Sequence, residues 1–150
     1  MARINYGAIA KARLDNVERE PNVRAADATV ELNASYRDTG QRPSIVVFET
    51  RRSAVPLQDI AAGSRQRYRV TWEIWVATFS ADSFADAASH RDELIGHIEV
   101  ALMNNRNLDG LLPAKNLILE GGEFRGGPGA ESGYVAEGSI VCSAEVTATT

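Results

Sequence analysis

One stretch of strict alternation, residues 67–79, constrains the fold of this chain more than any other feature. One side of the predicted strand is entirely apolar and carries Tyr68, Val70, Trp72, Ile74 and Val76. The other side is mixed and carries Arg69, Thr71, Glu73, Trp75 and Ala77. Because side chains alternate between the two faces of a strand, this pattern predicts a long strand with one face on a core.

A long helix is predicted directly after this strand, over residues 83–104. Apolar side chains recur there at helical spacing, and the predicted core stripe is Phe84, Ala88, Ile95, Ile98 and Leu102, with Ala87 and Leu94 beside it. Ser83 is the predicted N-cap, and Asp86 lies near the positive helix end. Residues 5–20 show a second helical stripe, which Pro21 ends.

Shorter strands are predicted on both sides of these elements, over 29–36, 44–49, 116–120 and 134–147. Strands joined by short connections favour antiparallel pairing. The predicted fold is therefore α+β: a small mixed, mostly antiparallel sheet of about four to five strands with two helices packed on one face. A single domain is expected over residues 1–150. The long connection at about 50–66 and the Gly-rich segment at about 121–133 are predicted to be mobile loops.

The composition leaves few groups for catalysis or metal binding. A single cysteine, Cys142, excludes an intrachain disulfide and a cysteine-based zinc site, and its apolar strand predicts a core position. His90, Glu93 and His97 share one helix face, which is read as a solvated surface in preference to a metal site. No run approaches the ~20 apolar residues that span a bilayer. The predictions are therefore no catalytic, cofactor-binding or metal-ligating residue, no cofactor and no membrane partner.

Charge is distributed unevenly along the chain, whose net charge is −4. Residues 37–69 carry seven arginines against three acidic residues, whereas residues 70–150 carry four basic and twelve acidic residues. Basic and acidic portions of one molecule can attract further copies of it. The candidate subunit or partner contacts are Arg51, Arg52, Arg65, Arg67, Arg69, Trp75, Phe124 and Arg125.

Two interpretations remain open for Trp75 and for the arginines that flank the long connection. Trp75, among charges on the mixed strand face, is an interface anchor or is packed under a neighbouring loop. The arginines flanking the long connection grip an acidic neighbour or solvate a loop.

The order of elements resembles a known family. The short strand after proline (Arg42-Pro43-Ser44-Ile45-Val46-Val47), the long loop, the strand Tyr68–Val76 and the helix Ser83–Asn104 with two closing strands resemble the tail terminator, or tail completion, proteins of long-tailed bacteriophages. The resemblance covers most of the chain and rests on element order, since no signature motif carries it.

The resemblance implies a structural role without catalysis. The expected partners are copies of the chain itself in a ring, a hexamer in this family, the tail tube protein, and the head–tail connector or head-closure protein, with DNA passing through the ring. The ring would cap the tube and stop its polymerisation. The expected locations are the tail or neck of the virion and the host cytoplasm during assembly.

Three alternatives remain. Another connector, head-closure or tail tube subunit would share this architecture. A small metal-dependent enzyme would use the face of His90, Glu93 and His97. A nucleic-acid-binding module would use the arginines, although the acidic total opposes it.

Overall fold

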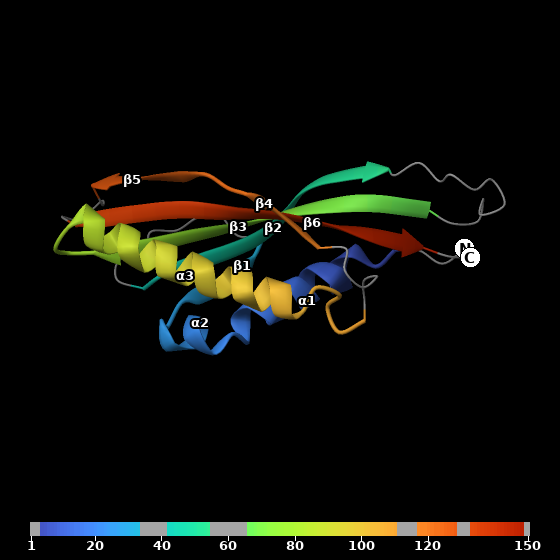
Figure 1. Cartoon of the computed structure of the whole chain (residues 1–150), viewed down its shortest axis with the longest axis horizontal. Coiled ribbons are helices and arrows are strands. Elements are labelled where there is room, and N and C mark those ends of the chain that lie inside the picture. Colours follow the sequence, from blue (N-terminus) through green and yellow to red (C-terminus); the bar gives the residue numbers. More distant parts are fainter. Residues whose placement is uncertain (1–3, 34–41, 55–65, 111–116, 129–132, 149–150) are drawn as a thin grey trace.

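The computed structural model describes residues 4–33, 42–54, 66–110, 117–128 and 133–148. Within them lie three helices, α1 (Tyr6–Glu18), α2 (Pro21–Ala25) and α3 (Phe84–Asn104). The same residues form six strands, β1 (Thr29–Leu32), β2 (Ser44–Ala54), β3 (Gln66–Ser80), β4 (Ile118–Gly121), β5 (Phe124–Pro128) and β6 (Tyr134–Ala148) (Figure 1).

All six strands belong to one mixed sheet, which confirms the predicted α+β class. The order is β1-β2-β3-β6-β4, and β5 pairs with β6 beside β4. Only β1 and β2 pair in parallel; the other pairs are antiparallel. β3 and β6 pair along their whole length, from Gln66 opposite Ala148 to Ser80 opposite Tyr134. This long pair forms the centre of the sheet.

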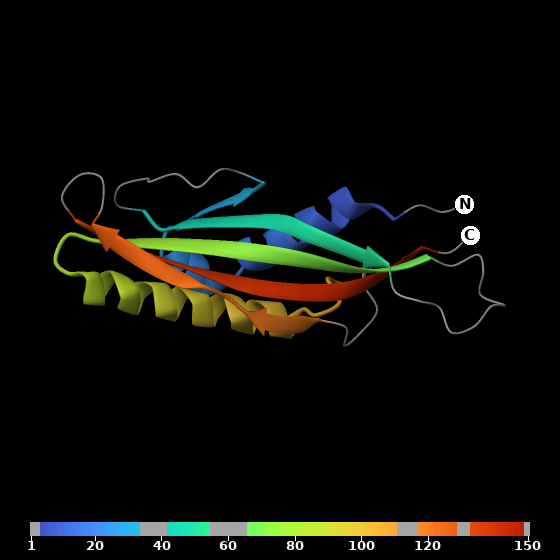
Figure 2. The same cartoon turned by 90° about the horizontal axis from the view of Figure 1, so that it is seen from above.

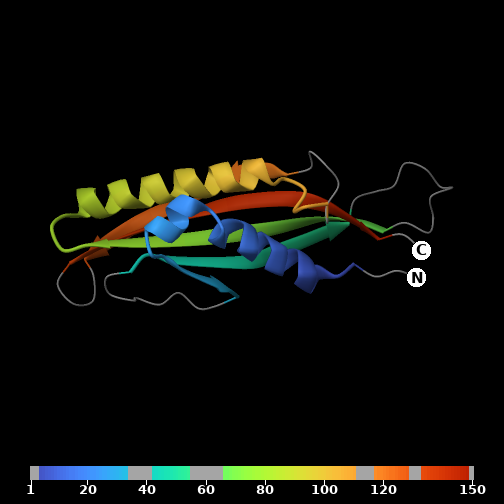
Figure 3. The ribbon, with the colours of Figure 1, turned by 90° about the horizontal axis from the view of Figure 1, so that it is seen from below.

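The helices pack on one face of the sheet, as predicted. Seen from below, the three helices lie in front of the strands, whereas the opposite view has the strands in front (Figures 2 and 3). The apolar face of β3 and the even-numbered residues of β6 point toward the helices and form the core with Ile9, Val17, Leu94, Ile98 and Leu102. No helix of the described chain is long and apolar enough to span a membrane.

The start of α3 confirms one prediction and corrects another. The backbone N–H of Asp86 donates to Ser83 Oγ (3.0 Å), so Ser83 is the N-cap. Phe84, however, is 39% exposed and does not belong to the core. Its ring lies against Gly126 of β5 because the buried stripe of α3 runs through Ala87 and Leu94 instead.

Two predicted loops are partly strand. Residues 51–54 continue β2 because they pair with β3, and residues 124–128 form β5 because they pair with β6. The Gly-rich composition thus concealed a strand. The rest of the long connection, 55–65, and residues 129–132 lie outside the described residues. The short helix α2, which begins at Pro21, was also not predicted.

A β-bulge in β2 reverses the direction of its last side chains. The register with β3 shifts between Glu49 and Arg51, so Thr50 is the extra residue. Beyond the bulge, Arg51 lies opposite Thr71 on the outer face, which carries no helix, and Arg52 lies opposite Val70 on the helix-bearing face. Without the bulge these two arginines would exchange faces.

Candidate subunit interface

The outer face of the sheet carries a chain of polar contacts across three strands. Arg69 of β3 donates from Nη1 to Ser143 Oγ and from Nη2 to Glu145 Oε1 of β6, both at 3.1 Å. Ser143 Oγ in turn donates to Glu120 Oε1 of β4 (3.1 Å). Arg69, Glu145 and Glu120 are thus all hydrogen-bonded within this set of contacts. The contacts hold these side chains in place on the outer surface of β3, β6 and β4.

Two of the arginines that flank the long connection, Arg52 and Arg67, form ion pairs within the chain. Arg67 Nε lies 3.8 Å from Glu145 Oε2, so Glu145 faces both Arg67 and Arg69. Arg52 pairs with Glu49 and stacks on the ring of Tyr6, with 3.5 Å between its Cζ and the ring centroid. Arg51 is exposed and has no ion-pair partner among the described residues. Arg65 lies outside those residues.

Trp75 is half-buried on the outer face, and a segment of the same chain covers part of it. Arg125 of β5 stacks on its indole, with Cζ 4.9 Å from the ring centroid, and Arg125 Nε pairs with Glu137 Oε2 at 3.1 Å. In the isolated chain, Trp75 is therefore packed against Arg125 of β5. A role for Trp75 between subunits stays a prediction.

Phe124 lies on the opposite face of β5 and is 59% exposed. The guanidinium of Arg91 from α3 stacks on its ring, with Cζ 4.6 Å from the centroid. Gly138, opposite Phe124 in β6, leaves room for this contact, because a Cβ there would lie 2.8 Å from Ile95 Cδ1 and 3.1 Å from Phe124 Cδ1. β5 therefore joins α3 to the sheet edge.

The sheet has two open edges with different chemistry. At one edge, β1 pairs with β2 only over Ser44–Val47, so Thr50–Ala54 have no second strand neighbour within the described chain. This β2 edge carries Arg51 and Arg52. Unpaired strand N–H and C=O groups are a template for pairing with another chain.

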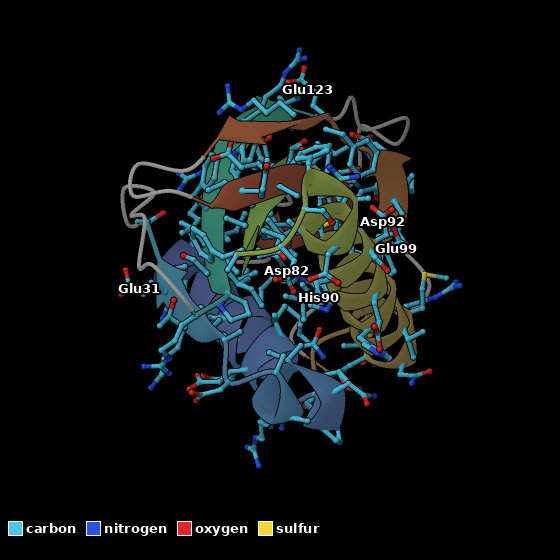
Figure 4. All side chains as sticks on the ribbon, turned by 90° about the vertical axis from the view of Figure 1, so that its left-hand side faces the viewer. Glu31, Asp82, His90, Asp92, Glu99 and Glu123 are labelled. Carbon is cyan, nitrogen blue, oxygen red and sulfur yellow. The ribbon has the colours of Figure 1, made fainter. Side chains whose placement is uncertain are left out.

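The opposite edge consists of β4 and β5, which have no strand neighbour other than β6 in the described chain. Here Ile118 is 47% exposed, and Glu120 and Glu123 are exposed as well. Figure 4 shows Glu123 projecting from this edge. The β4–β5 edge is therefore mainly apolar and acidic, with its Arg125 ion-paired to Glu137, whereas the β2 edge is mainly basic, with its Glu49 ion-paired to Arg52.

The remaining polar face of α3 offers no metal site within the described chain, where no group of three or more potential ligands occurs. His90 Nε2 lies 3.7 Å from Asp86 Oδ1, and His97 Nε2 lies 3.7 Å from Glu93 Oε1. His90 is thus paired with Asp86, and His97 with Glu93, in two separate i,i+4 pairs along the helix surface.

Cys142 lies fully buried in β6, as predicted, and burial raises the pKa of its thiol to about 11. Because the thiolate is the reactive form, iodoacetamide at pH 8 is expected to leave native Cys142 unlabelled and to label it rapidly in denaturant. Mass spectrometry of the intact protein measures this. Rapid labelling under native conditions would contradict the buried position.

The partners that complete this surface could not be found from the sequence. Glu145 and Ser143 contact Arg69, and Glu137 contacts Arg125, at separations of 12 to 76 residues along the chain, and Glu120 accepts a hydrogen bond from Ser143, 23 residues away. Alternation in β6 placed the first two on the polar face. Their pairing depends on the β3–β6 register, which alternation alone leaves undetermined.

The geometry thus defines a class: an α+β domain whose bare sheet face and two unlike open edges make it a candidate assembly subunit. No protein-family model matches the chain, and no curated protein sequence matches it. Among solved structures it is similar to a chain from the virion of a native gene transfer agent particle. The TM-score is 0.47 and the identity 16%, over 95% of this chain and 97% of that chain. Likeness of this degree does not bear on function.

Proposed function

We propose that this protein is a structural subunit of a phage-like particle and acts as a tail terminator. Its copies would pair edge to edge in a ring that caps the tail tube, stops polymerisation, and presents its other rim to the connector or head-closure protein. DNA would pass through the ring. The role needs no catalytic residue and no cofactor.

The observation that carries the proposal is the pair of open edges on one sheet. The β2 edge carries Arg51, a cation with no ion-pair partner in the described part of the chain, and the β4–β5 edge carries Ile118, Glu120 and Glu123. Joining the basic edge of one copy to the acidic edge of the next is a heterologous contact. Such contacts generate a ring when the rotation closes and a filament when it does not.

The closest alternative function is that of a tail tube subunit, which would use the same edges. Electron micrographs of the purified protein distinguish the two. A terminator is expected to stop at single rings and to shorten tubes when it is added to polymerising tube protein. Continuous tubes formed by the protein alone would favour the tube subunit, and micrographs without rings or tubes would contradict both.

Changing either edge is expected to block association. Arg51→Glu places a carboxylate opposite the acidic β4–β5 edge of the next copy. Ile118→Lys replaces an apolar contact with a cation that faces the basic β2 edge of the neighbouring copy. Each variant alone should remain monomeric in sedimentation velocity at concentrations where the wild type associates. An equimolar mixture should associate, because each variant contributes one unaltered edge.

Two matched variants control for charge and exposure. Lys11→Glu changes the charge by the same amount on the exposed side of α1, and Val100→Lys replaces an exposed apolar residue of α3. Both should associate like the wild type. If Ile118→Lys associates normally while Arg51→Glu does not, the contact is symmetric between β2 edges and the heterologous arrangement is wrong.

A further inference from the structure

Helix α1 packs on the sheet through a stripe that includes two buried polar side chains, with Tyr6, Ala12 and Leu14 partly buried beside it. Its buried residues are Ile9, Arg13, Asn16 and Val17, so half of them are polar. In α3, by contrast, six of the seven buried residues are apolar. The hydrophobic contribution that holds a helix on a sheet is proportional to the apolar area removed from water. α1 is therefore attached less firmly than α3.

Arg13 is fully buried and incompletely bonded. Its Nη1 donates a long hydrogen bond to Asn16 Oδ1 (3.4 Å), and its Cζ lies 5.4 Å from the centroid of the Trp72 ring. Its Nε and Nη2, like Trp72 Nε1, have no hydrogen-bond partner in the described chain. Desolvation lowers the pKa of Arg13. A buried charge without full partners destabilises the contact that buries it.

A second contact fastens the first turn of α1. The Tyr6 ring lies under the guanidinium of Arg52, which is held by Glu49, with Arg52 Nη2 donating to Glu49 Oε2 at 3.0 Å. Arg52 and Glu49 both belong to β2, so this stack ties the helix to the strand edge. Cation–π contacts at partly exposed sites are modest in strength and can exchange for other partners.

The far end of α1 has a natural pivot. The helix ends at Glu18, and Glu20 has an extended backbone (φ −62°, ψ 123°) before α2 begins. Arg19, which pairs with Asp109 (Nη2–Oδ2 3.3 Å) at the surface, precedes this bend and would move with α1, whereas Val23 of α2 is buried in the core. α2 thus stays anchored when α1 moves.

We propose that α1 is a hinged cover, which opens from the sheet about Glu20 while β3, β6 and α3 stay folded, and that the Tyr6–Arg52 stack is its latch. The incompletely bonded Arg13 keeps the closed state only slightly favoured. Because Arg52 lies on the open β2 edge, a neighbouring strand that pairs there and draws Arg52 away unlatches the helix. This last step rests on the proposed function; the opening itself does not.

Native-state hydrogen exchange on the dilute, monomeric protein tests the cover. In the wild type, amides of α1 should exchange faster than those of β3 and β6. Arg13→Met keeps the length of the side chain but removes the charge and the unpaired donors, and it should slow α1 exchange by about tenfold or more. Arg52→Ala removes the latch and should accelerate α1 exchange without changing β3 or β6.

Lys11→Met is the matched control, because Lys11 is exposed on the same helix, and it should leave α1 exchange unchanged. The cover is refuted if α1 in the wild type exchanges only together with β3 and β6, or if Arg13→Met exchanges as fast as the wild type or unfolds. The coupling is tested separately at concentrations where subunits associate. Faster α1 exchange there supports it, and unchanged or slower exchange refutes it while leaving the monomer result intact.

Discussion

Replacing Ile98 with aspartate is expected to unfold the domain. Ile98 is fully buried in the middle of α3, where it packs in the core against the sheet. Loss of a buried aliphatic side chain costs about 2–5 kcal/mol, and an unpaired carboxylate in the same place adds several more. Domains of this size are stable by only ~5–15 kcal/mol. Far-ultraviolet circular dichroism and a thermal melt would measure the loss.

The control for this prediction lies two residues away. Val100 is 55% exposed, so Val100→Asp places the same carboxylate in water and should melt close to the wild type. A cooperative, wild-type-like melt for Ile98→Asp would show that α3 packs on the sheet through a different face.

Replacing Gly122 with alanine is expected to abolish association while the core stays folded. Gly122 lies between β4 and β5, where the chain crosses β6 so closely that a Cβ would lie 1.7 Å from the carbonyl oxygen of Ser139. Backbone must therefore move, which breaks the hydrogen bonds that Glu123 makes there with Ser139 (2.9 and 3.0 Å). The β4–β5 edge would lose its position, and with it the edge that the proposed contact uses.

Sedimentation velocity and a thermal melt separate the two effects of Gly122→Ala. Association should be lost, whereas the melting transition should remain cooperative. Gly96→Ala is the control, because beyond its chain neighbours and the backbone of its own helix no described atom lies within 4 Å of its Cβ position, and alanine there should stabilise the helix by about 0.5–1 kcal/mol. Normal association of Gly122→Ala would mean that the β4–β5 edge is not a contact surface.

The strongly periodic elements were predictable from the sequence. Alternation over 67–79 identified β3, and the helical stripe after Ser83 identified α3, because burial of one face determines the period. Phe84 was misassigned to the core because it lies four residues before Ala88, at helical spacing from the predicted stripe. In the structure the buried stripe begins at Ala87, and the Phe84 ring lies against Gly126 of β5.

The Gly-rich strand and the bulge could not be predicted. β5 contains Gly126 because the ring of Phe84 and the carbonyl oxygen of Val135 occupy the space of a side chain, a tertiary reason that composition does not record. The bulge at Thr50 likewise depends on pairing with β3. These two features decide where Arg125 and Arg51 point, so they also decide the candidate interface.

The candidate residues were predicted by type but not by partner. Arginines near the long connection were predicted to contact other subunits. Three of them are paired within the chain, Arg67 and Arg69 with Glu145 across the β3–β6 register and Arg52 with Glu49 of its own strand. Arg51 has no ion-pair partner among the described residues. Its role between subunits stays a prediction.

If the two open edges join copies of this chain into a closed assembly, sedimentation equilibrium of the purified protein should reveal it across a wide concentration range. We expect a single species of fixed multiple mass that does not grow further at higher concentration. A protein that stays monomeric throughout that range would show that the edges do not join copies of the chain.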